Sequence, residues 1–104
     1  MAQFDVYQNL DPVSSEIIPY LLDIQHQLHQ SLATRMVVPL LKQQVSGHGI
    51  QKLCPQVSFG GETFTASVPE MAGYPVHDLG PKAGSLSEMR DEILTAVDFL
   101  LCGF

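Results

Sequence analysis

The chain has 104 residues, of which 45% are hydrophobic and 15% are charged, and its formal net charge is −6. This length suits a single domain, residues 1–104, that can bury a core without disulfide bonds. The five lysines and arginines are scattered, whereas nucleic-acid binding draws on clustered basic side chains. We therefore expect no direct binding to DNA or RNA, and an acidic surface that suits a basic protein partner.

The sequence shows no targeting or anchoring signal. Residues 1–10 lack the basic start and the apolar run of a secretion signal, and no stretch approaches the length of a membrane span. The two cysteines, Cys54 and Cys102, do not suggest a disulfide framework. We expect a cytoplasmic protein with no membrane contact.

Short β-rich runs bounded by proline and glycine predict an antiparallel sheet over most of the chain. The expected strands, in chain order, are residues 3–7, 20–25, 35–40, 57–59, 62–68 and 74–79. Gly60 and Gly61 supply the positive φ angles that a two-residue hairpin turn requires. The pattern of residues 26–33 fits either a helical turn or a loop, and residues 42–52 are expected to form a loop.

Residues 85–101 have the pattern of one helix. Ser85-Leu86-Ser87-Glu88 is typical of a capping box, in which the Ser85 hydroxyl accepts from the Glu88 amide. The last two turns are apolar on more than one face, which favours packing against the sheet and against a second subunit. Gly103 is expected to end the helix in the left-handed conformation. The alternative is that the segment is only the core helix of a small domain.

Six short motifs lie in order along nearly the whole chain. They are Gln3-Phe4-Asp5-Val6-Tyr7, Leu22-Asp23-Ile24-Gln25, Arg35-Met36-Val37-Val38-Pro39-Leu40, Met71-Ala72-Gly73-Tyr74-Pro75, Asp91-Glu92-Ile93 and Gly103-Phe104. Each motif alone is weak, but all six in this order resemble the CcdB family, the toxins of bacterial CcdA/CcdB toxin–antitoxin pairs.

This resemblance implies a fold and an activity. The fold is mainly β within the α+β class, an SH3-like small barrel of antiparallel strands with one C-terminal helix at a homodimer interface. The activity is not enzymatic and needs no cofactor and no metal, because the toxin binds the GyrA subunit of DNA gyrase and traps the gyrase–DNA cleavage complex. A CcdA-like antitoxin neutralises the toxin through a disordered C-terminal segment.

The resemblance also assigns contact residues, matched position by position. The gyrase-binding residues are expected on the helix and after the second strand, at His26, Leu28, His29, Asp91, Asp98, Leu101, Cys102, Gly103 and Phe104. The antitoxin-binding residues are expected at Gln8, Ser14, Leu41 and Val45. Gyrase presents arginines at its site, so Asp98 suits a charge-assisted contact. Cys102 replaces the tryptophan of the best-known plasmid toxin, and losing such a hot spot typically weakens binding by roughly 2 kcal/mol or more.

Two residue patterns have sharper alternative interpretations. His26 and His29 would form half of a metal site, but no second Cys or His pair follows at ligand spacing. Two Cys102 thiols that meet at a two-fold axis would form a bridge between subunits if their Cα atoms came within about 7 Å. The expected state of Cys102 is a reduced, small apolar residue.

Two alternative functions remain open at this point. An mRNA endoribonuclease of the related MazF and Kid fold would need a general acid–base pair and a cationic group at the scissile phosphate. Arg35 with His48, His77 or Asp23 would fill those roles, although the net charge of −6 argues against RNA binding. The other alternative is an inactive homologue that only titrates the antitoxin.

Overall fold

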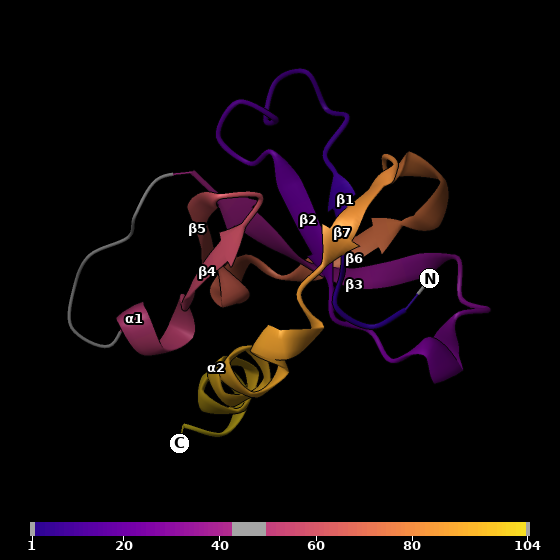
Figure 1. Cartoon of the computed structure of the whole chain (residues 1–104). Coiled ribbons are helices and arrows are strands. Elements are labelled where there is room, and N and C mark those ends of the chain that lie inside the picture. The colour runs from indigo at the N-terminus through magenta and orange to yellow at the C-terminus, as the bar shows by residue number, and fades with distance from the viewer. Residues whose placement is uncertain (1, 43–49, 104) are drawn as a thin grey trace.

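A computed structural model shows a curled antiparallel sheet with one longer helix beneath it (Figure 1). The structure describes residues 2–42 and 50–103. The strands are β1 Asp5–Gln8, β2 Tyr20–Asp23, β3 Thr34–Leu41, β4 Gln56–Phe59, β5 Glu62–Ala66, β6 Ala72–Pro75 and β7 Lys82–Ser85. The α-helices are α1 Ile50–Leu53 and α2 Arg90–Cys102, and the 3-10 turns are η1 Gln27–His29, η2 Val68–Glu70, η3 Val76–Asp78 and η4 Ser87–Met89. The expected α+β class with mainly β structure is confirmed.

The sheet runs in the order β4-β5-β3-β2-β1-β7, and every pair is antiparallel. β3 is the longest strand and pairs with β2 along one edge. Along its other edge it pairs first with β6, from Thr34 opposite Pro75, and then with β5, up to Leu41 opposite Thr65. Because one strand serves two partners in succession, the sheet curls into the half-barrel of an SH3-like fold.

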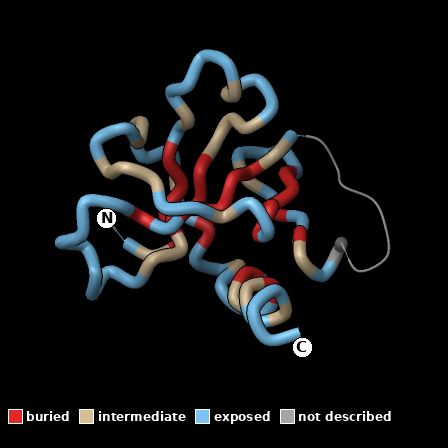
Figure 2. Tube along the Cα trace, turned by 180° about the vertical axis from the view of Figure 1, so that it is seen from behind, coloured by how far each residue is buried: buried red, intermediate tan, exposed pale blue. Residues whose placement is uncertain are grey.

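The core lies inside this curl. Val6, Leu22, Val38 and Leu40 come from three adjacent strands and are each 0% exposed. Figure 2 shows the buried positions gathered along the central strands and on the inner side of α2. Each such side chain contributes roughly 1.5–3 kcal/mol through its removal from water. Three or four consecutive positions are buried in each of β1, β2 and β3, so these central strands are covered on both faces.

The hairpin of β4 and β5 turns at Gly60 and Gly61, as predicted. Their φ angles are +60° and +82°, the left-handed values that glycine adopts without a steric penalty. Tyr20 of β2 packs edge-on against Phe59 and Phe64, with ring centroids 5.1 and 5.5 Å away. This aromatic contact ties the hairpin to the centre of the sheet.

The start of the helix differs from the prediction. α2 begins at Arg90, and Ser85 instead ends β7, where it pairs with Asp5 of β1. The Ser85 hydroxyl accepts from the Ser87 amide at 3.2 Å, so the predicted capping box is wrong. Its backbone is held by the sheet, and the turn η4 leads into the helix one turn later. Tertiary pairing has overridden a local helix signal.

The strand predicted at residues 74–79 is also wrong. β6 ends at Pro75 and the turn η3 follows. β7 was missed, because its Lys-Ala-Gly-Ser sequence has little β propensity. A Cβ atom at Gly84 would lie 2.7 Å from the Phe59 ring, so this strand packs closely through its glycine. The other five strands agree with the prediction to within two residues. The loop expected at residues 42–52 is interrupted by α1, which begins at Ile50 and ends one residue beyond the expected loop.

Candidate partner-binding surfaces

The end of α2 presents an apolar tip to solvent. Leu101 is 68% exposed, whereas Ile93 on the inner face of the same helix is fully buried. Gly103 ends the helix with a φ of +81°, as predicted, and its N–H donates to the Phe99 carbonyl at 3.0 Å. Packing at the inner face thus holds the helix while its last turn stays free. Phe104 lies outside the described residues.

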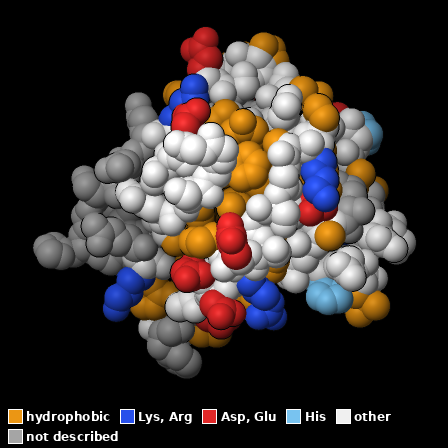
Figure 3. Space-filling view, in the orientation of Figure 1, with side chains coloured by type: hydrophobic (Ala, Val, Ile, Leu, Met, Phe, Trp, Pro, Cys, Tyr) orange, Lys and Arg blue, Asp and Glu red, His pale blue; other side chains and the backbone are white. Residues whose placement is uncertain are grey.

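The outer face of the helix region is acidic. The segment of residues 88–102 has one basic side chain, Arg90, and four acidic ones, Glu88, Asp91, Glu92 and Asp98. Figure 3 shows acidic side chains gathered over α2. Asp91, Asp98 and Cys102 are all exposed, so the expected contact residues of the helix face solvent. Such a surface favours a partner that carries arginine or lysine.

The second expected contact segment is the loop of residues 26–34, which contains η1. Leu28 is 77% exposed, and His26 and His29 on either side of it are exposed as well. The Leu28 amide donates to Nδ1 of His26 at 3.0 Å, which caps the turn. Of the two possibilities left open by the sequence, the structure has a helical turn. No residue of η1 is buried, so its side chains are accessible from solvent.

The helix end and this loop lie apart on one chain. Figures 1 and 2 view the molecule from opposite sides, and both place the C-terminal end of α2 and the turn at residues 27–29 at opposite sides of the molecule. The structure therefore groups the expected gyrase contacts into two patches. His26, Leu28 and His29 form one patch, and Asp91, Asp98, Leu101, Cys102 and Gly103 belong to the other.

Three of the four expected antitoxin residues lie elsewhere, at Gln8, Ser14 and Leu41. The loop between β1 and β2 leaves the sheet on the side away from α2 (Figure 1). Nδ2 of Asn9 donates to the Ser14 hydroxyl at 2.9 Å, and the Lys42 amide donates to the Ile17 carbonyl at 3.0 Å. These contacts join the loop to the ends of β1 and β3. Val45 lies outside the described residues.

This loop of residues 9–19 is also apolar on its outer side. Leu10, Val13 and Ile17 are 59%, 84% and 53% exposed. The loop is ordered by Asp11, which accepts from the Ser14 hydroxyl at 2.8 Å and from the Val13 amide at 3.2 Å. These hydrogen bonds hold the pKa of the Asp11 carboxyl below its ordinary value, with Ser14 making the larger contribution.

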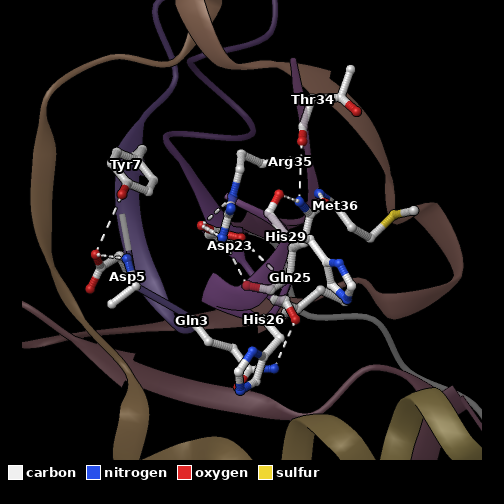
Figure 4. Close-up of polar contacts among 12 residues, drawn as sticks. Gln3, Asp5, Tyr7, Asp23, Gln25, His26, His29, Thr34, Arg35 and Met36 are labelled. Atoms are coloured by element: carbon white, nitrogen blue, oxygen red, sulfur yellow. Dashed lines mark hydrogen bonds and ion pairs between the residues drawn. The ribbon is translucent and has the colours of Figure 1, made fainter. Parts of the chain in front are cut away.

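A buried ion pair lies at the centre of the sheet (Figure 4). Arg35 and Asp23 are both 0% exposed, and Nε and Nη2 of Arg35 lie 2.9 and 2.8 Å from Oδ2 of Asp23. Burial raises the pKa of Asp23, and the hydrogen bond from Arg35 opposes that rise. Burial and the nearby carboxylates of Asp5 and Asp23 raise the pKa of Tyr7 to about 12. Nζ of Lys82 lies 3.3 Å from Oδ1 of Asp5.

This burial removes two residues of the ribonuclease alternative. Arg35 and Asp23 are engaged with each other inside the protein and do not reach a phosphate at the surface. His77 is exposed in η3, which directly follows β6, and its Nε2 lies 3.6 Å from Oδ1 of Asp78. His48 lies outside the described residues. Arg35 is therefore not available as the cationic group that would hold a scissile phosphate.

A shallow groove separates α1 from α2. Its volume is about 530 Å³ and its lining includes Lys52, Thr95, Phe99 and Gly103. Nζ of Lys52 lies 5.6 Å from the centre of the Phe99 ring, a cation–π distance. The groove thus borders the same helix end that exposes Leu101.

Within residues 2–42 and 50–103, no three His, Cys, Asp or Glu side chains gather as metal ligands would. Across the same part of the chain, no helix combines the length and the apolar character of a membrane span.

The fold and these surfaces define a small half-barrel domain with one C-terminal helix and with apolar side chains exposed at the helix end and in two loops. A family model described as CcdB protein matches residues 3–103, nearly the whole chain. The chain therefore belongs to the CcdB family, and it is a toxin of a toxin–antitoxin module. No match to it was found among curated proteins.

No sequence pattern singled out one further residue near these surfaces, Gln25. Gln25 lies between β2 and the exposed loop. Its side chain donates a hydrogen bond to the His29 carbonyl and accepts one from the Met36 amide. The available signal was indirect. Asp23 and Arg35 carry opposite charges within otherwise apolar strands, which indicates a buried pair beneath the loop.

Proposed function

We propose that this protein is a gyrase poison. It binds the GyrA subunit of DNA gyrase, stabilises the complex in which gyrase has cleaved DNA, and so stops replication and growth. It acts in the cytoplasm, without catalysis and without direct binding to nucleic acid. A trap of this kind requires only a higher affinity for one conformational state of its target.

The observation that carries this proposal is the exposed apolar tip of α2 on a chain of the CcdB family. Leu101 is 68% exposed at the last turn, and Asp98 lies one turn earlier on an acidic helix. A compact apolar tip fits a groove between subunits, and a carboxylate beside it suits an arginine of the target. The net charge of −6 agrees with a basic protein surface as the partner.

The working unit is a homodimer that a CcdA-like antitoxin neutralises. Leu100 is 37% exposed next to Leu101, so the end of α2 offers apolar area on more than one face. The loop of residues 9–19 and the end of β3 form the antitoxin surface, where Val13 is 84% exposed. This surface lies away from α2. An antitoxin segment that wraps the toxin and reaches both regions would cover the helix end and so displace gyrase.

The test is a cleavage-complex assay with purified protein, DNA gyrase, relaxed and supercoiled plasmid, and ATP. The variants are a deletion of residues 103–104 and the substitution Leu101→Ala. The matched control is Val13→Ala, which removes another strongly exposed apolar side chain, from the loop on the side of the sheet away from α2. Intact RNA is added in a parallel reaction to detect ribonuclease activity.

We expect linear plasmid with the wild type and with Val13→Ala, and a loss of it with the deletion. Leu101→Ala should weaken poisoning about tenfold or more, as truncation of a central interface residue does. If no variant and no wild type yields linear plasmid or binds gyrase, the proposal of a gyrase poison fails for that gyrase. Degraded RNA would then favour the endoribonuclease, and intact RNA would favour an inactive homologue that titrates antitoxin.

A further inference from the structure

Gln25 has a hydrogen-bond partner for each of its polar groups. Its amide N–H donates to Oδ1 of Asp23 at 3.0 Å, and its carbonyl accepts from Nη2 of Arg35 at 2.8 Å. Its side-chain Oε1 accepts from the Met36 amide at 3.0 Å. Its side-chain Nε2 donates to the carbonyls of His29 and Thr34, at 3.0 and 3.3 Å. A glutamine satisfied at every group is held in one conformation.

These side-chain bonds join the two ends of the exposed loop. The loop runs from residue 26 to residue 34, and Gln25 immediately precedes it. Its Nε2 reaches the carbonyl at the end of η1 and also the first residue of β3, while its Oε1 reaches two residues further along β3. Figure 4 shows the Gln25 side chain between His29 on one side and Thr34 and Met36 on the other.

The loop has little other support. Its short backbone bonds join residues only three apart, such as His29 to His26 at 3.0 Å and Leu32 to His29 at 3.2 Å. No residue of η1 is buried, and Leu32 is 54% exposed, so no side chain there anchors it in the core. Val76 adds one backbone bond to Ala33 at 2.9 Å, at the far end of the loop. The loop conformation therefore depends largely on Gln25.

Gln25 is itself held from beneath by the buried ion pair. Nη2 of Arg35 lies 2.8 Å from Oδ2 of Asp23 and donates to the Gln25 carbonyl at the same distance. Both charged side chains are 0% exposed, so their positions are set by the packed sheet. A continuous path of hydrogen bonds thus links the core of the sheet, through Gln25, to the loop that exposes Leu28.

We propose that Gln25 is a positioning residue that preorganises the loop of residues 26–34 for gyrase. This inference rests on the proposed function, because gyrase is the partner it assigns to the loop. A loop already held in its bound conformation loses less conformational entropy on binding, so the same contacts give a higher affinity. Gln25 acts through His29 and Thr34 and does not itself need to touch the partner.

The experiment compares three variants of the full chain. Gln25→Ala removes all three side-chain hydrogen bonds of Gln25, which together form the Gln25 clamp. Gln25→Glu keeps the size of the side chain and an acceptor for the Met36 amide, but it replaces both N–H donors with an oxygen facing two carbonyls. Gln56→Ala is the matched control, because Gln56 is an exposed glutamine of β4 outside this loop.

Two properties are measured for each variant. The first is amide hydrogen exchange of residues 28–34 in the free protein. The second is the affinity for the GyrA dimerisation domain, set against the affinity for the cognate antitoxin. We expect both Gln25 variants to exchange about tenfold faster in the loop and to bind gyrase about tenfold more weakly, the loss expected for one or two hydrogen bonds. Antitoxin affinity and the exchange of β1 should match the wild type.

Three results would overturn the inference. Unchanged loop exchange in Gln25→Glu would show that the two donated bonds are dispensable. Equal losses of gyrase and antitoxin affinity would mean that Gln25 acts only through overall stability. Wild-type affinity for gyrase in both variants would show that loop order does not limit binding. If the wild type itself fails to bind gyrase, the proposed function fails with the binding half of this inference, and the exchange data still decide whether the clamp exists.

Discussion

The two exposed segments that we assign to gyrase are held in place by different means. In the loop of residues 26–34, no side chain of η1 is buried. Hydrogen bonds of Gln25 connect this loop to the Arg35–Asp23 pair. The end of α2 needs no such fastening, because Ile93 packs in the core and the helix carries its last turn outward. One segment is positioned by polar contacts and the other by apolar packing.

In the two segments, the residues that hold the segment in place relate differently to the residues that are exposed on it. In the loop, a buried polar change should alter the exposed surface at a distance, because the path from Arg35 to His29 runs through hydrogen bonds. In the helix, the residues that stabilise and the residues that protrude lie on opposite faces of one rigid element. Substitutions of the buried ion pair should therefore affect stability and binding together, whereas on the helix the two properties should respond to different residues.

The largest effect is expected at the base of the loop. Arg35→Ala leaves the carboxylate of Asp23 buried without its partner, and breaking a buried pair in this way costs about 3–5 kcal/mol of unfolding free energy. Urea unfolding of the purified variant measures it. Arg90→Ala is the control, since this exposed arginine lies 3.5 Å from an exposed Asp91 and should change stability by less than about 0.5 kcal/mol. Equal effects at both arginines would contradict the role given to the buried pair.

A smaller effect should appear when the two faces of α2 are compared. Ile93→Ala removes a fully buried side chain and should lower the unfolding free energy by about 2–5 kcal/mol. Leu101→Ala removes one that is 68% exposed, so its effect on the stability of the free monomer should stay within about 0.5 kcal/mol. Thermal unfolding at several protein concentrations distinguishes the monomer from any dimer. A large loss for Leu101→Ala at the lowest concentration would mean that the tip packs within its own chain.

The smallest effect is a pH dependence beside the ion pair. The pKa of Tyr7 is raised to about 12, so between pH 10 and 12 the folded protein keeps a proton that the unfolded chain loses. The stability from Tyr7 is therefore complete below pH 10 and is lost as the pH rises through 12. Between pH 9 and 12, the wild type should lose on the order of 2 kcal/mol relative to Tyr7→Phe. Parallel pH curves for the two proteins would contradict the assigned burial of the phenol.

The features that local sequence could predict are those determined by local geometry. Gly60 and Gly61 indicated the hairpin because a two-residue turn requires their φ angles, and Gly103 indicated the helix end for the same reason. The helix start could not be predicted this way. Ser85 and Glu88 match a capping box, but the backbone of Ser85 pairs with Asp5, which is eighty residues away in the chain.

The candidate surfaces likewise combine features that the local sequence predicts with features that depend on distant contacts. The exposed positions on α2 followed from helical spacing and from the resemblance to the CcdB family, and the structure leaves Leu101 exposed. The clamp at Gln25 could not be predicted from spacing, because one of its bonds spans eleven residues to Met36 and it rests on a pair of charges from two strands. β7 escaped detection because its close packing depends on the contact of Gly84 with Phe59.

The most direct test of the gyrase-binding surface is site-specific photo-crosslinking with a benzophenone amino acid at Leu28, Leu101 or Val13. These three positions are 77%, 68% and 84% exposed, so each probe is similarly accessible. In the presence of gyrase and DNA, the probes at Leu28 and Leu101 should crosslink to GyrA, and the probe at Val13 should crosslink to the antitoxin when that is added. Crosslinks to gyrase from Val13 alone, or from none of the three positions, would contradict the assignment of the loop and the helix end as the gyrase-binding surface.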